Sequence, residues 1–192
     1  MIKSKLALYA AVIFIMLGVA MIVTSLTSVK EPREYHIHAD FRVYLNGTAW
    51  NFSQEKYVSD ESKVLDPVLH LHDMDGNVIH QHAEGVTLGD FFRSLNMTFN
   101  STCFVPDDGT EYCENLKMFV QHEGEGWEQN PEYGDYELQD IDRILITDSI
   151  EEDAIKEQMD SVTDMACIQS GTCPERGPPV GESSCSGEVC LV

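Results

Sequence analysis

Apolar and polar residues alternate along residues 34–45, which read EYHIHADFRVYL. Successive side chains of a β-strand point to opposite faces, so this alternation predicts a strand with one face on a core and one face away from it. Asn46-Gly47 follows and is typical of a two-residue hairpin turn, which returns the chain through residues 48–52. The polar positions, which face away from the core, are His36, His38, Asp40, Arg42 and Tyr44.

A second alternating stretch, residues 68–82, reads VLHLHDMDGNVIHQH and predicts a β-hairpin. A three-residue loop, Met74-Asp75-Gly76 with its glycine in the left-handed conformation, pairs His70 with His80 and places the histidines of both strands on one face. A two-residue loop at 75–76 slips the register by one and splits them between faces. The longer loop is favoured because it separates polar from apolar side chains. The four histidines are His70, His72, His80 and His82.

The next segment, GVTLGDFFRSLNM, predicts one short helix. Thr87 is a favourable N-cap and Asp90 stands at the capping-box position. Beyond it, residues 102–113 predict another hairpin with a three-residue loop, which sets Cys103 opposite Cys113 at the separation that a cross-strand disulfide needs. Residues 116–122 and 142–147 are apolar enough to predict two further strands.

The N-terminus predicts a membrane anchor. Residues 6–29 carry no charge and are long enough to cross a bilayer as a helix, with residues 1–5 as a cytoplasmic stub. A cleaved signal peptide is the alternative, but its apolar core is usually shorter and no Ala-x-Ala site follows this one. Six cysteines beyond the anchor and four glycosylation sequons indicate that the rest of the chain lies outside the cytoplasm. The sequons begin at Asn46, Asn51, Asn96 and Asn100.

After the anchor, residues 30–148 predict one extracytoplasmic α+β domain, and residues 149–192 predict a short acidic helix followed by a cysteine-rich tail. This tail is rich in Gly, Pro and Ser and should be mostly irregular. Its four thiols favour two disulfides, but their pairing cannot be read from the sequence. A zinc site is the alternative, although structural zinc usually needs closer cysteine spacing. The tail cysteines are Cys167, Cys173, Cys185 and Cys190.

The predicted fold is therefore α+β, a mostly antiparallel sheet with one short packed helix. The order hairpin, helix, strands and the late pattern LKMFVQHEGE…YELQDIDRILIT are similar to the β-grasp (ubiquitin-like) fold. Separately, HIHADFRVYLNG, LHLHDMDGNVIHQHAEGVTLGDFF and CIQSGTCPERG resemble a group of single-anchor, histidine-rich extracytoplasmic prokaryotic proteins. That resemblance implies no particular activity.

The three His-x-His pairs indicate a metal site. Imidazole suits zinc, copper, nickel and iron, and opposed strand positions lie about 5 Å apart. The hairpin histidines are the first candidates, and His36 and His38 join them if their strand lies beside the hairpin. Asp40 and Asp73 are candidate acceptors for ring N–H groups. Solvent-facing histidines on a strand are the plainer alternative, and three pairs on one face favour zinc or copper over it. His122 stands alone and is interpreted as a surface residue.

Charge and missing motifs narrow the function further. The chain has 12 Lys and Arg against 33 Asp and Glu, a net charge of −21, which repels nucleic acid and attracts cations. No His-Glu-x-x-His pattern, nucleophile motif or phosphate-binding loop appears, so the sequence does not indicate an enzyme. A membrane-anchored metal-binding protein is the first hypothesis. A cell-surface interaction or assembly module with a pH-sensitive histidine face and no metal is the alternative, and the sequence indicates no particular protein partner.

Overall fold

The computed structural model describes residues 35–60, 63–72, 75–177, 185–186 and 189–190. The chain divides into two compact units, Met1–Arg33 and Glu34–Val192, and only the second contains described residues. The anchor expected at residues 6–29 and the stub at residues 1–5 lie outside them. Within the described ranges, no helix combines the length and the apolar character that a membrane crossing needs.

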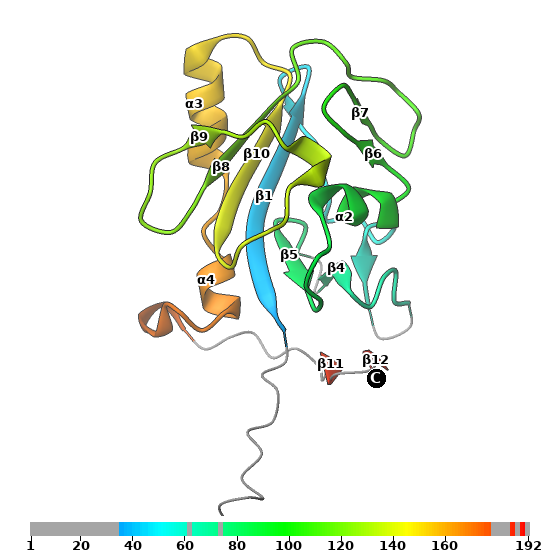
Figure 1. The fold of residues 1–192 in the computed structure, drawn as a ribbon, viewed down its shortest axis with the longest axis vertical. Helices are drawn as coiled ribbons and strands as arrows, with labels where there is room; N and C mark the ends of the chain where they lie inside the picture. The colour runs from blue at the N-terminus through cyan, green and yellow to red at the C-terminus, as the bar shows by residue number, and fades with distance from the viewer. Residues whose placement is uncertain (1–34, 61–62, 73–74, 178–184, 187–188, 191–192) are drawn as a thin grey trace, which may run out of the picture. The chain divides into compact units, whose positions relative to one another are not determined.

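An eight-stranded mixed sheet is the centre of the second unit (Figure 1). Strand β1 lies between β5 and β10, and it runs antiparallel to β5 and parallel to β10. Strands β3 and β4 are also parallel, whereas the other neighbours are antiparallel. In order across the sheet, the strands are β3 (Val58–Ser59), β4 (Leu69–His72), β5 (Val78–Gln81), β1 (Ile37–Leu45), β10 (Asp142–Thr147), β8 (Lys117–Gln121) and β9 (Glu128–Gln129), while β2 (Thr48–Ala49) pairs with β1.

Both sequence-predicted turns of this region produce the expected pairing. Asn46 and Gly47 have φ angles of 50° and 72°, the positive values of a type I′ hairpin turn, and Leu45 pairs with Thr48. In the second hairpin His70 pairs with His80, as the three-residue loop requires. The tip of that loop, residues 73–74, lies outside the described residues.

The role expected for Gly76 is wrong, because its φ angle is not positive. Its glycine identity is explained by a close approach of two backbones instead. A Cβ atom at this position would lie 2.3 Å from the Ser53 nitrogen and 2.4 Å from the Phe52 carbonyl carbon. The Gly76 amide also donates to Ser53 Oγ at 3.1 Å, which fixes the hairpin against the segment that follows β2.

Gly76→Ala is therefore expected to destabilise the fold by about 1–3 kcal/mol, the usual effect of overpacking against backbone that cannot move aside. Urea unfolding of the two proteins measures the difference. Gly126→Ala is the matched control, because a Cβ there meets nothing within 4 Å. Equal losses in the two variants would show that the contact with Ser53 relaxes freely.

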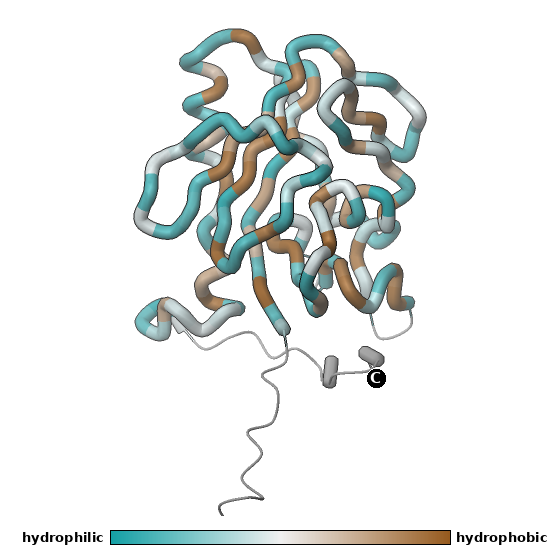
Figure 2. Tube along the Cα trace, viewed as in Figure 1, coloured by the Kyte–Doolittle hydropathy of each residue, from teal (hydrophilic) through white to brown (hydrophobic). Residues whose placement is uncertain are grey.

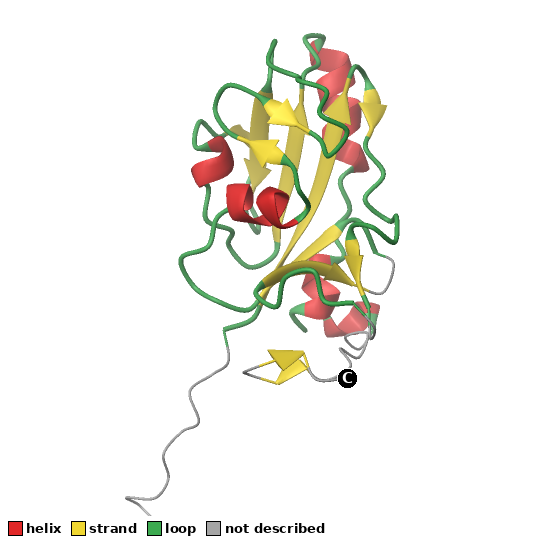
Figure 3. Ribbon diagram, turned by 90° about the vertical axis from the view of Figure 1, so that its right-hand side faces the viewer, coloured by secondary structure: helices red, strands yellow, loops and turns green. Residues whose placement is uncertain are grey.

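Helices cover both faces of the sheet (Figure 3). Helix α2 (Leu88–Ser94) lies on the face that carries Ala39, Phe41 and Val43, and together they form the main core. Its predicted cap is confirmed: Thr87 Oγ1 accepts from the Asp90 amide, and Asp90 Oδ2 accepts from the Thr87 amide. Along strand β1, hydrophobic and hydrophilic residues alternate in the chain (Figure 2).

The opposite face is covered by helices α3 (Glu152–Ser161) and α4 (Ala166–Gln169). Ile155 and Val162 pack there against Leu145, and the backbone amide of Ala166 donates to the Asp40 carboxylate. Residues from α3 to Arg176 thus form a second layer on the sheet. The remaining short elements are η1 (Tyr133–Asp135), η2 (Pro174–Arg176), the pair β6 (Thr98–Phe99) and β7 (Phe104–Val105), and the pair β11 (Cys185–Ser186) and β12 (Val189–Cys190).

The predicted disulfide between Cys103 and Cys113 is confirmed, with Phe104 opposite Tyr112 in the register that the three-residue loop requires. Cys167 and Cys173 form a second disulfide, which closes a loop directly after α4 begins. The four tail cysteines therefore do not act as a zinc site together, because this pair is already oxidised.

The predicted fold class is wrong. A mostly antiparallel, β-grasp-like sheet was expected, whereas the sheet is mixed, with β1 parallel to β10 and β3 parallel to β4. More than one helix packs on it, and residues 166–177 of the expected irregular tail include a helix and a 3₁₀ turn. The strand pattern predicted which residues face the core. It carried no information on which segment covers the polar face, where buried Asp40 receives backbone donors from residues 165–166.

Candidate metal centre

Three adjacent strands bring the three His-x-His pairs onto one face. Strand β5 lies between β4 and β1, and its residue His80 is opposite both His70 on β4 and His38 on β1. These three positions form a row across the sheet. The other three histidines lie beside this row. On one side of it, the rings of His36 and His82 stack with centroids 4.3 Å apart. On the other side, the ring centroid of His72 lies 3.8 Å from that of His80.

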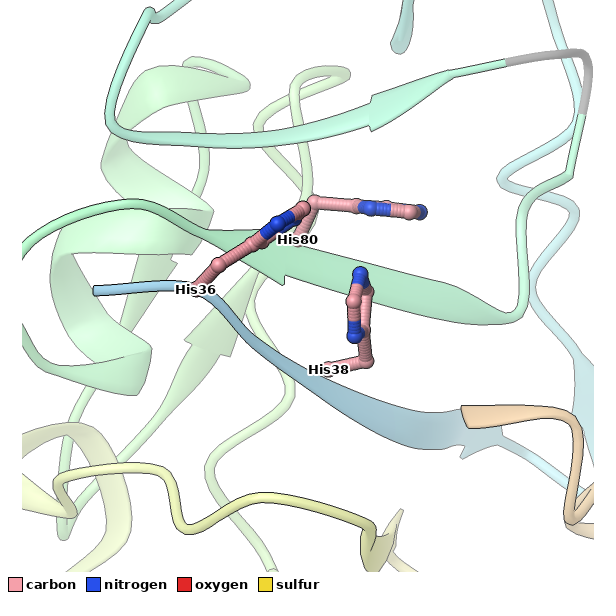
Figure 4. A group of neighbouring side chains, drawn as sticks. All are labelled: His36, His38 and His80. Atoms are coloured by element: carbon pink, nitrogen blue, oxygen red, sulfur yellow. The ribbon is translucent and has the colours of Figure 1, made fainter. Parts of the chain in front are cut away.

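Three of these residues are close enough to share an ion. His36, His38 and His80 each offer one ring nitrogen, and these nitrogens all lie within 4.8 Å of one another. Figure 4 shows the three imidazoles converging from the start of β1 and from β5. Zinc–nitrogen bonds of 2.0–2.1 Å place two ligand nitrogens about 3.3 Å apart in a tetrahedral site, so small side-chain rotations close the remaining gap. This group could hold a metal ion.

The row is interior. His38, His70 and His80 are each only 2% exposed, and the other three histidines are half-buried. Side chains on a solvent-facing strand would not be covered in this way. A buried imidazole needs partners for its ring nitrogens, because burying a polar group without them costs free energy. The cluster therefore depends on the contacts that orient each ring.

A hydrogen-bond chain orients His38. Its Nδ1 lies 2.7 Å from Ser170 Oγ, and Ser170 Oγ donates to Asp140 Oδ1 at 2.5 Å. Since the hydroxyl proton goes to the carboxylate, Ser170 accepts from His38 Nδ1–H, and Nε2 is the unprotonated nitrogen. A metal-binding histidine usually donates its second N–H to an acceptor of this kind, which fixes the ring and its tautomer. The Cys167–Cys173 disulfide closes the loop that carries Ser170.

His70 is oriented by the backbone. Its Nδ1 lies 2.9 Å from the carbonyl oxygen of Asp66, which can only accept, so Nδ1 carries the proton and Nε2 is the unprotonated nitrogen. On the same side of the sheet, His72 Nε2 and His80 Nδ1 are 3.1 Å apart. These two contacts orient the imidazole rings on the β4 side of the cluster.

The structure gives Asp40 a role other than the expected contact with an imidazole. Its carboxylate accepts from the Thr163 hydroxyl and from the amides of Met165 and Ala166, which holds the start of α4 on the sheet. Asp73 lies outside the described residues. Sequence reasoning missed Ser170 and Asp140, because they stand more than a hundred residues from His38 and no local pattern links them to it.

His122 is not isolated. Its Nδ1 lies 2.7 Å from Asp142 Oδ1, and Asp142 Oδ2 accepts from the Tyr136 hydroxyl at 2.6 Å and from the Gln139 amide at 2.8 Å. Asp142 is only 1% exposed, and burial raises the pKa of this carboxyl above its usual value. The carboxylate joins the start of β10 to the end of β8.

The raised pKa of Asp142 predicts the sign of a pH effect. The folded chain takes up this proton at higher pH than the unfolded chain, so the contribution of Asp142 to stability is lost as pH rises through its folded pKa and is present at lower pH. The free energy of unfolding should therefore rise more on acidification from pH 7 in the wild type than in Asp142→Asn. Urea unfolding across pH measures both slopes, with exposed Asp135→Asn as the control. Identical slopes in all three proteins would contradict the assignment.

Comparison with known protein families, with curated proteins and with solved structures finds no match to this chain. The geometry of the histidine cluster is the observation from which its chemistry can be inferred.

Proposed function

We propose that this protein binds a transition metal, zinc or copper, at the outer side of a membrane that residues 6–29 anchor it to. The observation that carries the proposal is the group His36, His38 and His80, whose ligand nitrogens lie within 4.8 Å of one another on adjacent strands. The oriented ring of His38 adds to it, because a fixed tautomer presents Nε2 as a ligand.

The donor set favours zinc or copper over other cations. Ca²⁺ and Mg²⁺ take oxygen ligands, whereas all three donors of this group are imidazoles. Thiolate ligands are not offered by Cys103, Cys113, Cys167 or Cys173, since these form disulfides. The alternative of a metal-free interaction face needs histidines that a partner can reach, and three of the six are buried.

Two features support a location outside the cytoplasm. Two disulfides fit an oxidising compartment, and the asparagines of all four sequons are exposed. The net charge of −21 draws cations toward the surface of the chain and raises their local concentration. Surface capture followed by binding at the buried histidines is the sequence of events that we infer.

Calorimetric titration of the untagged full-length protein with zinc and with copper tests the proposal. We compare the wild type with His38→Gln/His80→Gln and with His122→Gln, which changes a histidine outside the cluster. Binding should disappear in the double variant and persist in His122→Gln. Equal binding in all three proteins, or none in the wild type, would refute a metal function for the cluster.

A further inference from the structure

His80 stands between two sets of histidines. On one side, its ring centroid is 4.6 Å from that of His38 on β1. On the other side, its ring centroid is 3.8 Å from that of His72 on β4, and the nitrogens His80 Nδ1 and His72 Nε2 are 3.1 Å apart. The central strand of the three therefore carries one imidazole in contact with both neighbouring strands.

One ion cannot use all six histidines. Structural zinc almost always has four ligands, and His36, His38 and His80 already supply three of them. His36 and His38 stand at the start of β1, so their ion lies toward that strand, and the imidazoles of β4 need another explanation.

On the β4 side, two nitrogens have the spacing of a ligand pair, whereas within the described residues only His36, His38 and His80 bring three donors within 4.8 Å of one another. The 3.1 Å between His72 Nε2 and His80 Nδ1 is close to the roughly 3.3 Å that a tetrahedral zinc ion imposes on two ligands. The nearby ring of His70 is held by the Asp66 carbonyl with Nε2 unprotonated, the usual arrangement of a histidine ligand. Its centroid lies 5.6 Å from that of His72 and 5.9 Å from that of His80.

We propose that the cluster binds two metal ions, with His80 as a bridging ligand between them. The inference rests on the proposed function. The first ion is bound by His36, His38 and His80 Nε2, and the second by His70, His72 and His80 Nδ1. In the metal-free chain of this proposal, His80 Nδ1–H donates the hydrogen bond to His72 Nε2, and His72 keeps its own proton on Nδ1. The second ion displaces the Nδ1 proton of His80, which becomes an imidazolate, and the released proton goes to solvent.

Metal stoichiometry tests this inference. The untagged full-length protein is saturated with zinc, freed of excess and measured by native mass spectrometry. We expect two ions in the wild type and one each in His36→Gln/His38→Gln and His70→Gln/His72→Gln. His72→Gln alone should also retain one ion. Because it changes a single half-buried residue, it tests the inference even if the double variants do not fold.

The outcomes separate the two proposals. No bound ion in the wild type would refute the proposed function itself. If the wild type binds one ion and His70→Gln/His72→Gln also binds one, the proposed function stands and the second metal site is refuted. Two ions bound to His72→Gln would refute the second site as well. Copper(II) gives an independent readout by electron paramagnetic resonance. An imidazolate bridge couples the unpaired electrons of the two copper ions, so the wild type should show a weakened signal. His72→Gln should show the full signal of a single copper ion.

Discussion

Ser170→Ala is expected to weaken metal affinity by about 10- to 100-fold, the usual effect of removing the group that orients a histidine ligand. Ser170 Oγ accepts a hydrogen bond from His38 Nδ1–H and donates one to Asp140 Oδ1. Without the hydroxyl, the ring of His38 loses the partner that fixes its tautomer and its rotation. Ser170 is half-buried at the end of α4, so the fold should survive the change. Zinc titration together with urea unfolding of the metal-free protein measures both effects.

Thr172→Ala is the matched control for Ser170→Ala. Thr172 lies in the same loop, closed by the Cys167–Cys173 disulfide, but is exposed and bonds only to the Cys167 carbonyl oxygen. Its variant should bind zinc as the wild type does. If Ser170→Ala also keeps full affinity, Ser170 is a polar residue of the loop and His38 is oriented by other contacts.

Local patterns were sufficient to predict the pairing within each hairpin. The register of His70 with His80 follows from loop length and from the separation of polar and apolar side chains. The same reasoning gives the disulfide of Cys103 with Cys113. These features depend on residues within about fifteen positions of each other, so their determinants are all present in one short stretch of sequence.

The parts that sequence reasoning missed depend on segments far apart in the chain. Alternation along β1 shows that it has two distinct faces, but the parallel pairing with β10 and the cover by α4 are tertiary choices. The glycine at position 76 illustrates the same limit, because Ser53 makes it necessary and a turn preference does not. The sequence could add His36 and His38 to the metal site only on the condition that their strand lies beside the hairpin. The pairing of β1 with β5, which sets His38 opposite His80, meets this condition.

Phe92→Ala is expected to lower the free energy of unfolding by about 3–5 kcal/mol, because a large ring leaves a cavity in a close-packed core. Phe92 lies on α2, is fully buried and contacts five other phenylalanine rings with centroids 4.9–6.3 Å away. These rings lie on the face of the sheet opposite the histidines. Phe119→Ala, a half-buried position in the smaller core of the other face, should have a smaller effect.

Zinc should reverse much of the loss in Phe92→Ala. The histidines are brought together only when β4, β5 and β1 are paired, so a metal that binds them stabilises the folded chain over the unfolded one. At a free zinc concentration of 1,000 times Kd, this stabilisation is about 4 kcal/mol. Urea unfolding of Phe92→Ala with and without zinc measures the recovery. The same variant combined with His38→Gln/His80→Gln should show none, since its core is equally damaged and its ligands are gone. A recovery of equal size in both proteins would mean that zinc binds elsewhere on the acidic surface.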